Sequence, residues 1–295
     1  MSTGRRSSNL RGIAAMLIAA GVFSFMDTGL KLLSPHYPAL EVTALRSASS
    51  LPFIAAWIAW RGGFHTVLRV RWALHLLRGI LGIGILSMFT VSVRRLALAE
   101  AYSIFFVAPA LITALSALVL KERVGAARWA AIAVGLSGVV VVLRPTGQGM
   151  MTTAGLAALA AAGGYAVVAV LVRILGRTDS SDSMVLWQMV VMGAGAGAAA
   201  APGWVPVRPE HAWIIGVVAV SGFVGQVAIT EAFRQGEASV VAPFEYTAMA
   251  WGVGLDWILW HVFPDAATIV GATLIVGSGL YLVRREAVHV EAEHP

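Results

Sequence analysis

The chain has 295 residues, of which 58% are hydrophobic and only 12% are charged, and its mean hydropathy is +0.80. Soluble domains carry roughly 25% charged residues, so this composition excludes an ordinary water-soluble protein and predicts an integral membrane protein. The chain contains no cysteine, which excludes disulfides, thiolate nucleophiles and cysteine-based metal sites. The net charge of +6 does not indicate nucleic-acid binding, because the basic residues lie at the ends of apolar runs and form no basic face with interleaved aromatic residues.

Ten apolar runs close to bilayer-spanning length follow one another along the chain, separated by charged residues or by Pro and Gly. Each run is expected to be helical, because hydrocarbon offers no partner to a backbone amide, and no alternation of polarity indicates a β-barrel. The sequence therefore predicts an all-α integral membrane protein with ten transmembrane helices. They cover residues 10–33, 40–60, 71–93, 97–119, 126–143, 151–175, 182–203, 210–232, 238–260 and 266–284.

The distribution of basic residues predicts how these helices are oriented. The connections are short, so neighbouring helices are antiparallel, and an even number of spans places both termini on one side. Fourteen Arg and Lys residues fall on that side and five on the other, so the positive-inside rule predicts cytoplasmic termini in a bacterial-type inner (plasma) membrane, with a short cytoplasmic tail at 287–295. The fourteen are Arg5, Arg6, Arg11, Arg61, Arg69, Arg71, Lys121, Arg123, Arg128, Arg173, Arg177, Arg234, Arg284 and Arg285, and the five are Lys31, Arg94, Arg95, Arg144 and Arg208.

A loop at residues 144–149 divides the ten helices into two halves of five, at residues 1–145 and 150–286. Because the number per half is odd, any repeat is inverted across the membrane. Weak internal similarity supports a repeat: Ala99-Glu100-Ala101 opens the fourth span and Gly236-Glu237-Ala238 opens the ninth. Two inverted halves around a central cavity are typical of secondary transporters.

Four charged residues, Asp27, Arg46, Arg78 and Glu245, lie inside the predicted spans. A charge at the bilayer centre costs roughly 2.5 to 3.5 kcal/mol, so each is expected to be paired or to face water. At about 1.5 Å of rise per residue, Asp27 and Arg46 lie at similar depths on the outer side, and Arg78 and Glu245 on the inner side. We expect these two pairs to meet and to flank a central cavity; static ion pairs that only join helices are the alternative.

The ninth span carries a further pattern. Glu245, Met249, Gly252 and Asp256 follow the spacing i, i+4, i+7, i+11 and would share one helix face. This stripe is predicted to line the cavity; ordinary core packing is the alternative. Other polar or aromatic candidates for the cavity or its gates are Tyr246, Trp251, Tyr102, Tyr165, Trp187, Gln188 and Gln226.

Two prolines predict breaks inside helices. Pro109 in the fourth span and Pro243 in the ninth each remove a backbone donor from the helix. Broken helices near the midplane commonly face a binding site, although a plain kink is equally compatible with the sequence.

Several stretches resemble the drug/metabolite transporter superfamily, in particular its ten-helix EamA-type members. The residues that carry this resemblance are Asp27 with Lys31, Leu45-Arg46, Leu77-Arg78-Gly79, Ala108-Pro109, Leu120-Lys121-Glu122-Arg123-Val124, Ala242-Pro243-Phe244-Glu245-Tyr246-Thr247 and Pro264-Asp265-Ala266-Ala267-Thr268. The resemblance implies two EamA-like halves, and among EamA-type members the chain resembles the YddG-type amino-acid exporters. The Gly-Glu that usually precedes the last span is replaced here by His261-Val262, so any coupling role of that glutamate does not carry over.

The sequence lacks the motifs of the competing classes. It has no His-Glu-x-x-His helix, Gly-x-Ser-x-Gly elbow or phosphate-binding loop, so we expect no enzyme, no catalytic residue, no metal, no cofactor and no ATP-driven transport. We expect a secondary transporter that exports amino acids or related small polar metabolites by alternating access. Its partners would be that small-molecule substrate and the lipid bilayer, without nucleic acid, in a monomer or weak oligomer. A transporter of another metabolite or drug-like amphiphile, a channel, and a lipid-handling or scaffold protein remain alternatives.

Overall fold

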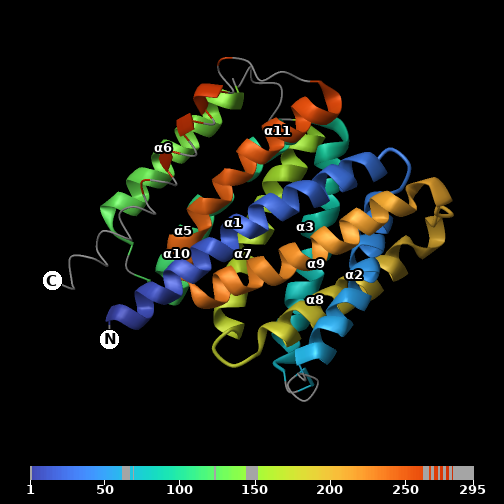
Figure 1. The fold of residues 1–295 in the computed structure, drawn as a ribbon, viewed down its shortest axis with the longest axis horizontal. Coiled ribbons are helices and arrows are strands. Elements are labelled where there is room, and N and C mark those ends of the chain that lie inside the picture. The colour runs from blue at the N-terminus through green and yellow to red at the C-terminus, as the bar shows by residue number, and fades with distance from the viewer. Residues whose placement is uncertain are drawn as a thin grey trace.

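The structure, a computed structural model, describes residues 2–61, 67–68, 70–122, 124–143 and 152–261, followed by 266, 269–271, 273–274, 277–278 and 281. All regular elements within these ranges are helical (Figure 1). The predicted loop at 144–149 and the tail at 287–295 lie outside the described residues, and the predicted tenth span at 266–284 lies largely outside them.

The first nine predicted spans are helical over most of their described residues. The continuous helices are α1 (Ser2–Leu33), α2 (Ala39–Arg61), α3 (Trp72–Arg95), α6 (Ala126–Leu143), α7 (Thr153–Leu175), α8 (Ser181–Ala200) and α9 (Ala212–Gln235). Two short 3-10 turns, η3 (Ala201–Gly203) and η4 (Pro209–His211), lie between α8 and α9. In the described chain, seven helical stretches are long and apolar enough to cross a membrane, and a shorter apolar stretch lies within α6.

Polar caps fix where two of these helices begin. The side chain of Thr152 accepts a hydrogen bond from the amide of Gly155, and Ser180 accepts one from the amide of Ser183. Each satisfies an amide of the first turn that has no partner within the helix. These caps set the starts of α7 and α8 within two residues of the prediction.

The fourth and ninth spans are interrupted. The fourth consists of α4 (Leu98–Phe105), α5 (Ala108–Leu115) and the π-helical turn η2 (Ser116–Leu120), and the ninth consists of α10 (Ala238–Val241), the 3-10 turn η5 (Ala242–Thr247) and α11 (Ala248–Trp260). Pro109 lies at the start of α5 and Pro243 at the start of η5. Both spans also end in a left-handed residue, Lys121 at φ 55° and His261 at φ 54°, so the same local geometry recurs at the end of each.

Helices that are distant in the sequence pack on one another. The most extensive contacts join α1 to α9, α2 to α8 and α3 to α7, and Figure 1 shows α1 and α9 side by side. This set of contacts is symmetric. If α1 is exchanged with α7, α2 with α8 and α3 with α9, the same three pairs of helices result. The helix α6 lies at the edge of the bundle, against α4 and η5.

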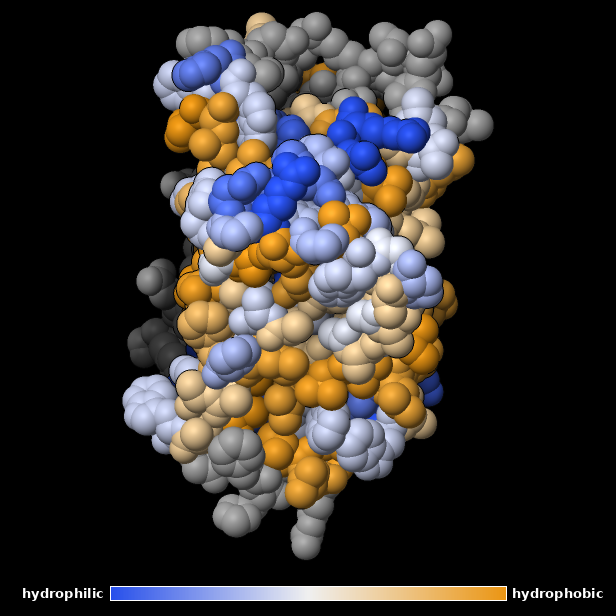
Figure 2. Space-filling view, turned by 90° about the vertical axis from the view of Figure 1, so that its right-hand side faces the viewer, coloured by the Kyte–Doolittle hydropathy of each residue, from blue (hydrophilic) through white to orange (hydrophobic). Residues whose placement is uncertain are grey.

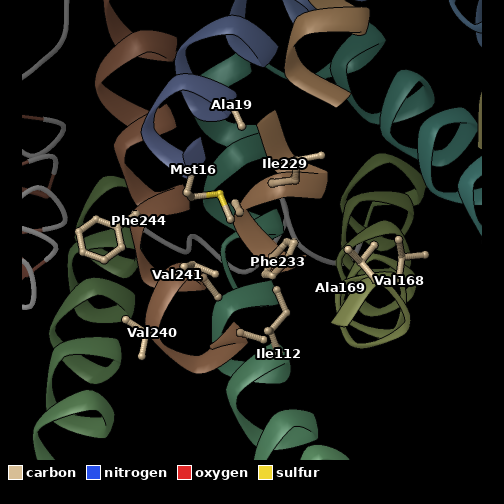
Figure 3. Packing of buried hydrophobic residues seen from close by; sticks show 14 of the residues in the cluster. Met16, Ala19, Ile112, Val168, Ala169, Ile229, Phe233, Val240, Val241 and Phe244 are labelled. Carbon is tan, nitrogen blue, oxygen red and sulfur yellow. The ribbon is translucent and has the colours of Figure 1, made fainter. Parts of the chain in front are cut away.

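Apolar side chains fill the interior and also cover the exterior. In the largest core cluster, Met16 of α1, Ile112 of α5, Phe233 of α9 and Val241 of α10 lie close together (Figure 3). Figure 2 shows hydrophobic residues over the middle and lower part of one face, with strongly hydrophilic residues gathered toward its upper part. Ile80 is 61% exposed and Leu118 is 77% exposed. An exterior of this kind suits contact with lipid.

The connection between α7 and α8 is held to α3 by Asp179. The carboxylate accepts hydrogen bonds from Thr178 Oγ1 at 2.6 Å and from the amide of Arg71 at 3.2 Å, and it lies 2.8 Å from His75 Nε2. Burial alone would raise the pKa of Asp179, but the hydrogen bonds from Thr178, His75 and Arg71 lower it below its usual value. Because the folded-state pKa is lowered, the stabilisation is fully present above the unfolded-state pKa and is lost as the pH falls through the folded-state pKa.

We therefore expect Asp179→Asn to lower the free energy of unfolding by about 1 to 3 kcal/mol at pH 7, and to lower it by less near pH 3. Denaturation of the purified protein in detergent, monitored by tryptophan fluorescence at both pH values, measures this difference. Glu210→Gln is the control, because the Glu210 side chain is 66% exposed and should change stability little. Equal stability of wild type and Asp179→Asn at pH 7 would contradict the prediction.

Candidate functional site

A central cavity of about 190 Å³ lies between the helices of the two predicted halves. Its walls are formed by α1, α2, α3 and α4 from the first half and by α7, α8, α9 and the η5–α11 segment from the second. Most of the lining is apolar and includes several phenylalanines. The polar lining residues are Ser24, Asp27, Arg46, Arg78, Tyr102, Tyr165, Gln188, Gln226 and Glu245.

The predicted contact between Asp27 and Arg46 is wrong. Asp27 Oδ2 instead accepts a hydrogen bond from the hydroxyl of Tyr102 at 2.8 Å. The similar depth of the two residues placed them in the same cavity, but depth does not fix the direction in which a side chain leaves its helix. The Arg46 guanidinium lies near three neutral acceptors: Met26 Sδ at 3.4 Å, Met189 Sδ at 3.2 Å and Gln226 Oε1 at 3.3 Å.

The predicted contact between Arg78 and Glu245 is wrong for the same reason. Arg78 Nη1 donates to the main-chain oxygen of Met184 at 2.8 Å, and Nη2 donates to Thr230 Oγ1 at 3.3 Å. Glu245 Oε1 accepts from the hydroxyl of Tyr165 at 2.9 Å. Among the described residues, no carboxylate oxygen lies within the 4.0 Å ion-pair distance of either buried guanidinium.

Each of the two carboxylates that line the cavity thus accepts a hydrogen bond from a tyrosine. Each of these bonds joins the first and fourth spans of one half. Asp27 of α1 pairs with Tyr102 of α4, and Glu245 of η5 pairs with Tyr165 of α7, so the carboxylate and the hydroxyl exchange helices between the halves. The sequence singled out all four residues but not these pairings. No sequence signal distinguishes a tyrosine that bonds a carboxylate from one that only packs.

Four of the candidate residues do not line the cavity. Tyr246 is buried against Phe106 with 5.2 Å between ring centroids, and Met249 lies in the same apolar cluster. Trp251 is 46% exposed and packs on Phe25. Trp187 donates from Nε1 to the main-chain oxygen of Val67 at 2.6 Å.

The predicted stripe on the ninth span therefore reaches the cavity only at Glu245. The reason is the 3-10 turn η5, which has about 3.0 residues per turn. Glu245 therefore leaves the chain in a different direction from the residues that α-helical spacing would place on the same face of α11. Gly252 packs instead against the ring of Tyr102, because a Cβ at this position would lie 2.9 Å from two ring carbons. Asp256 points to α1 and α4.

Two polar clusters lie at opposite ends of the bundle. In the Lys31–Asp256 cluster, Asp256 Oδ1 lies 3.4 Å from Lys31 Nζ, and Asp256 Oδ2 accepts from the amide of Ala99 at 3.3 Å. In the Arg173–Glu122 cluster, Glu122 Oε1 lies 3.7 Å from Arg173 Nε and accepts from the amide of Ala238 at 3.2 Å.

The two clusters are built alike with the halves exchanged. Each joins a carboxylate, Asp256 on the ninth span or Glu122 just after the fourth, to a basic residue near the end of the first helix of the other half. The same carboxylate also accepts from an amide at the start of the other half's fourth span. Nothing in the sequence pairs these residues: Lys31 and Arg173 count among the basic residues at the ends of spans, and Lys31 and Glu122 belong to stretches that carry the family resemblance.

Comparison with known proteins gives a family and a fold. The model of the EamA-like transporter family matches this chain twice, over residues 10–144 and 152–284. The pseudopaline exporter of Pseudomonas aeruginosa is 27% identical over 92% of this chain and 96% of its own length. The riboflavin transporter of Vibrio cholerae is 25% identical over 94% of both chains. The S-adenosylmethionine uptake transporter of Rickettsia conorii is 24% identical over 97% of this chain and 96% of its own.

A solved crystal structure shares the fold. It superimposes with a TM-score of 0.77 at 20% identity and covers 96% of this chain and 99% of that chain. The arrangement of helices around the cavity is therefore one already seen in another protein.

Proposed function

The chain belongs to the EamA-like transporter family, and from this premise we propose that it exports amino acids or related small polar metabolites by alternating access. It is a multi-pass membrane transporter and not an enzyme. The observation that carries the proposal is the central cavity, where both halves contribute walls and four buried charged residues meet an apolar lining.

The size of the cavity favours a small solute. Sites for drug-sized ligands typically measure roughly 300 to 1,000 Å³, whereas this cavity measures about 190 Å³. The two carboxylates and two guanidiniums supply partners for both signs of charge. An amino acid with an apolar side chain matches the size, the charges and the lining together.

The proposed topology has ten helices in two inverted halves, at residues 1–145 and 150–286, with both termini in the cytoplasm of a bacterial-type inner membrane. The excess of Arg and Lys on the terminal side supports this orientation. The contacts that persist when the halves are exchanged, together with the two family matches, support the repeat. We propose a monomer or weak oligomer as the working unit.

The two polar clusters serve as gates in this proposal. The Lys31–Asp256 cluster would close the outer end of the cavity and the Arg173–Glu122 cluster the inner end. Each cluster joins the two halves, so a rocking motion of one half against the other would separate one cluster while the other stays closed.

The principal alternative is transport of another metabolite or of a drug-like amphiphile, which the apolar lining with Phe23, Phe89 and Phe233 favours. A lipid-handling or scaffold role has less support, because such a protein does not require four charged residues in one buried cavity. Counterflow separates these classes, since a carrier exchanges labelled for unlabelled solute and a scaffold does not.

Counterflow in proteoliposomes loaded with each of the twenty amino acids tests the proposal. We expect saturable exchange for a subset with apolar side chains, and a response to an imposed proton gradient would identify the energy source. Absence of exchange for every amino acid, with exchange of a different metabolite, would replace amino-acid export with the alternative.

Glu245→Gln is expected to reduce counterflow about tenfold, because it removes a buried charge from the cavity wall. The glutamine oxygen can still accept the hydrogen bond from Tyr165, so the packing around it is retained. Trp251→Phe is the control, since Trp251 lies outside the cavity. Normal counterflow by a stably folded Glu245→Gln protein would remove Glu245 from the transport mechanism.

A further inference from the structure

We propose that Arg78 and Gln188 bind the headgroup of a zwitterionic substrate, with the carboxylate at the guanidinium of Arg78 and the ammonium at Oε1 of Gln188. This inference rests on the proposed function and specifies where in the cavity the substrate is held. Both side chains line the cavity, from α3 and α8.

Arg78 is a buried cation with no anion beside it among the residues that the structure describes. Its side chain is 1% exposed, and the two terminal nitrogens donate to neutral acceptors, the main-chain oxygen of Met184 and the hydroxyl of Thr230. Its third nitrogen, Nε, has no hydrogen-bond partner within the described chain. A buried charge is unfavourable unless it is paired, and a carboxylate is the group whose geometry best fits a guanidinium. A substrate carboxylate would supply the missing charge.

Gln188 provides an acceptor on the stretch of α8 that holds this cation, because Arg78 Nη1 donates to the main-chain oxygen of Met184, one helical turn before Gln188. Its Nε2 donates to the main-chain oxygen of Arg78 at 3.3 Å. Because that oxygen can only accept, the NH₂ group of the amide must face it, and Oε1 is the free end. Oε1 is buried without a partner in the described chain. An ammonium, which can only donate, is the complementary group.

The backbone makes room for this arrangement at Gly82. A Cβ on Gly82 would lie 2.2 Å from Gln188 Nε2 and 2.7 Å from Met192 Sδ. Any side chain at this position would therefore displace Gln188 from Arg78. The absence of a side chain at Gly82 therefore leaves room for the Gln188 amide against α3.

The second arginine is less suited to the carboxylate. All three nitrogens of Arg46 have neighbours that can accept, two thioether sulfurs and Gln226 Oε1. It is also linked to Arg78 along α9, since Gln226 Nε2 lies 3.5 Å from Thr230 Oγ1, which accepts from Arg78. Arg46 therefore contributes positive potential to this wall, whereas Arg78 retains an unused donor.

The test compares three ligands that differ only in the headgroup: phenylalanine, its carboxamide, which lacks the negative charge, and its N-acetyl derivative, which lacks the positive charge. Affinities are measured by thermal stabilisation of purified full-length protein. Wild type should prefer phenylalanine over each derivative by roughly tenfold to a hundredfold. Should another amino acid give the strongest counterflow, its three forms are used instead.

The variants assign each preference to one residue. Arg78→Gln should abolish the preference for the carboxylate while retaining that for the ammonium, and Gln188→Met should do the reverse. Arg78→Lys should restore part of the carboxylate preference, because lysine keeps the positive charge but lacks the planar guanidinium that can donate two hydrogen bonds to one carboxylate. Arg46→Gln removes positive potential from this wall and should reduce the carboxylate preference by less than Arg78→Gln does. Circular dichroism checks that each variant is folded.

Three outcomes separate this inference from the proposed function. Binding of phenylalanine with its headgroup preference unchanged in Arg78→Gln overturns the inference and leaves amino-acid export intact. A carboxylate preference lost in Arg46→Gln and kept in Arg78→Gln overturns it in favour of the other arginine. If the wild type and its folded variants bind no amino acid at all, the proposed substrate class fails and the inference fails with it.

Discussion

Oxidation of a cysteine pair introduced at Ala44 and Gly197 is expected to reduce counterflow to the level of empty liposomes, and reduction of the disulfide is expected to restore it. A Cβ on Gly197 would lie 3.9 Å from the Cβ of Ala44, within the range of about 3.5 to 4.5 Å found in disulfides. The two residues join α2 to α8, one helix from each half. If transport requires the outer ends of these helices to separate, a covalent bond between them stops the cycle.

The chain offers clean controls for this experiment. It has no native cysteine, so each single variant forms no intramolecular disulfide and should transport like wild type. Ser47 and Gly193 provide a second pair one turn deeper, with 3.5 Å between the Cβ atoms. A mobility shift on a non-reducing gel verifies that the bond has formed. Full counterflow by the verified disulfide form would show that α2 and α8 move together, and the rocking motion would have to lie elsewhere.

Weakening the two polar clusters is expected to open the cavity in opposite directions. Asp256→Asn removes the charge that holds Lys31, and Glu122→Gln removes the charge that holds Arg173. Hydrogen bonds to charged groups contribute about 1.5 to 3 kcal/mol, so each change should shift the population of open protein by roughly tenfold to a hundredfold. The first should favour opening to the outside and the second opening to the cytoplasm.

A cysteine in the cavity reports these shifts. Ala169→Cys provides the reporter, because Ala169 lines the cavity and is 1% exposed. With a membrane-impermeant thiol reagent, Asp256→Asn should accelerate labelling in right-side-out vesicles, and Glu122→Gln should accelerate it in inverted vesicles. Exchanging the charges, as Lys31→Asp with Asp256→Lys, should return labelling toward the wild-type rate. Acceleration on the same side by both variants would contradict the gate assignment.

The apolar runs predicted where helices lie in the described chain, because length and hydrophobicity indicate which segments can span a bilayer. The sequence also located the interruptions, since Pro109 and Pro243 act through the missing donor wherever they occur. The grouping of Asp27, Arg46, Arg78 and Glu245 around one cavity followed from the cost of isolating a charge in hydrocarbon.

The direction in which a side chain leaves its helix is harder to predict from sequence than the depth of the residue in the membrane. Nothing in the sequence indicates that Tyr102 rather than Arg46 bonds Asp27, because that contact depends on how α1, α2 and α4 are rotated about their axes. The stripe of Met249, Gly252 and Asp256 does not line the cavity, because the α-helical spacing used to predict it does not hold through the 3-10 turn at residues 242–247. The phenylalanines of the lining looked like ordinary core residues, and nothing in their spacing distinguished them.

The fourth and ninth spans both end in a left-handed residue, but the acids of the two polar clusters occupy different positions relative to those ends. Directly after Lys121 stands Glu122, which pairs with Arg173, whereas directly after His261 stands Val262. The second half supplies its carboxylate from Asp256, on the preceding helix. Each barrier therefore depends on acids encoded in different parts of the gene. Natural selection can adjust the stability of one barrier without touching the other, and in this way set the side on which the empty carrier waits.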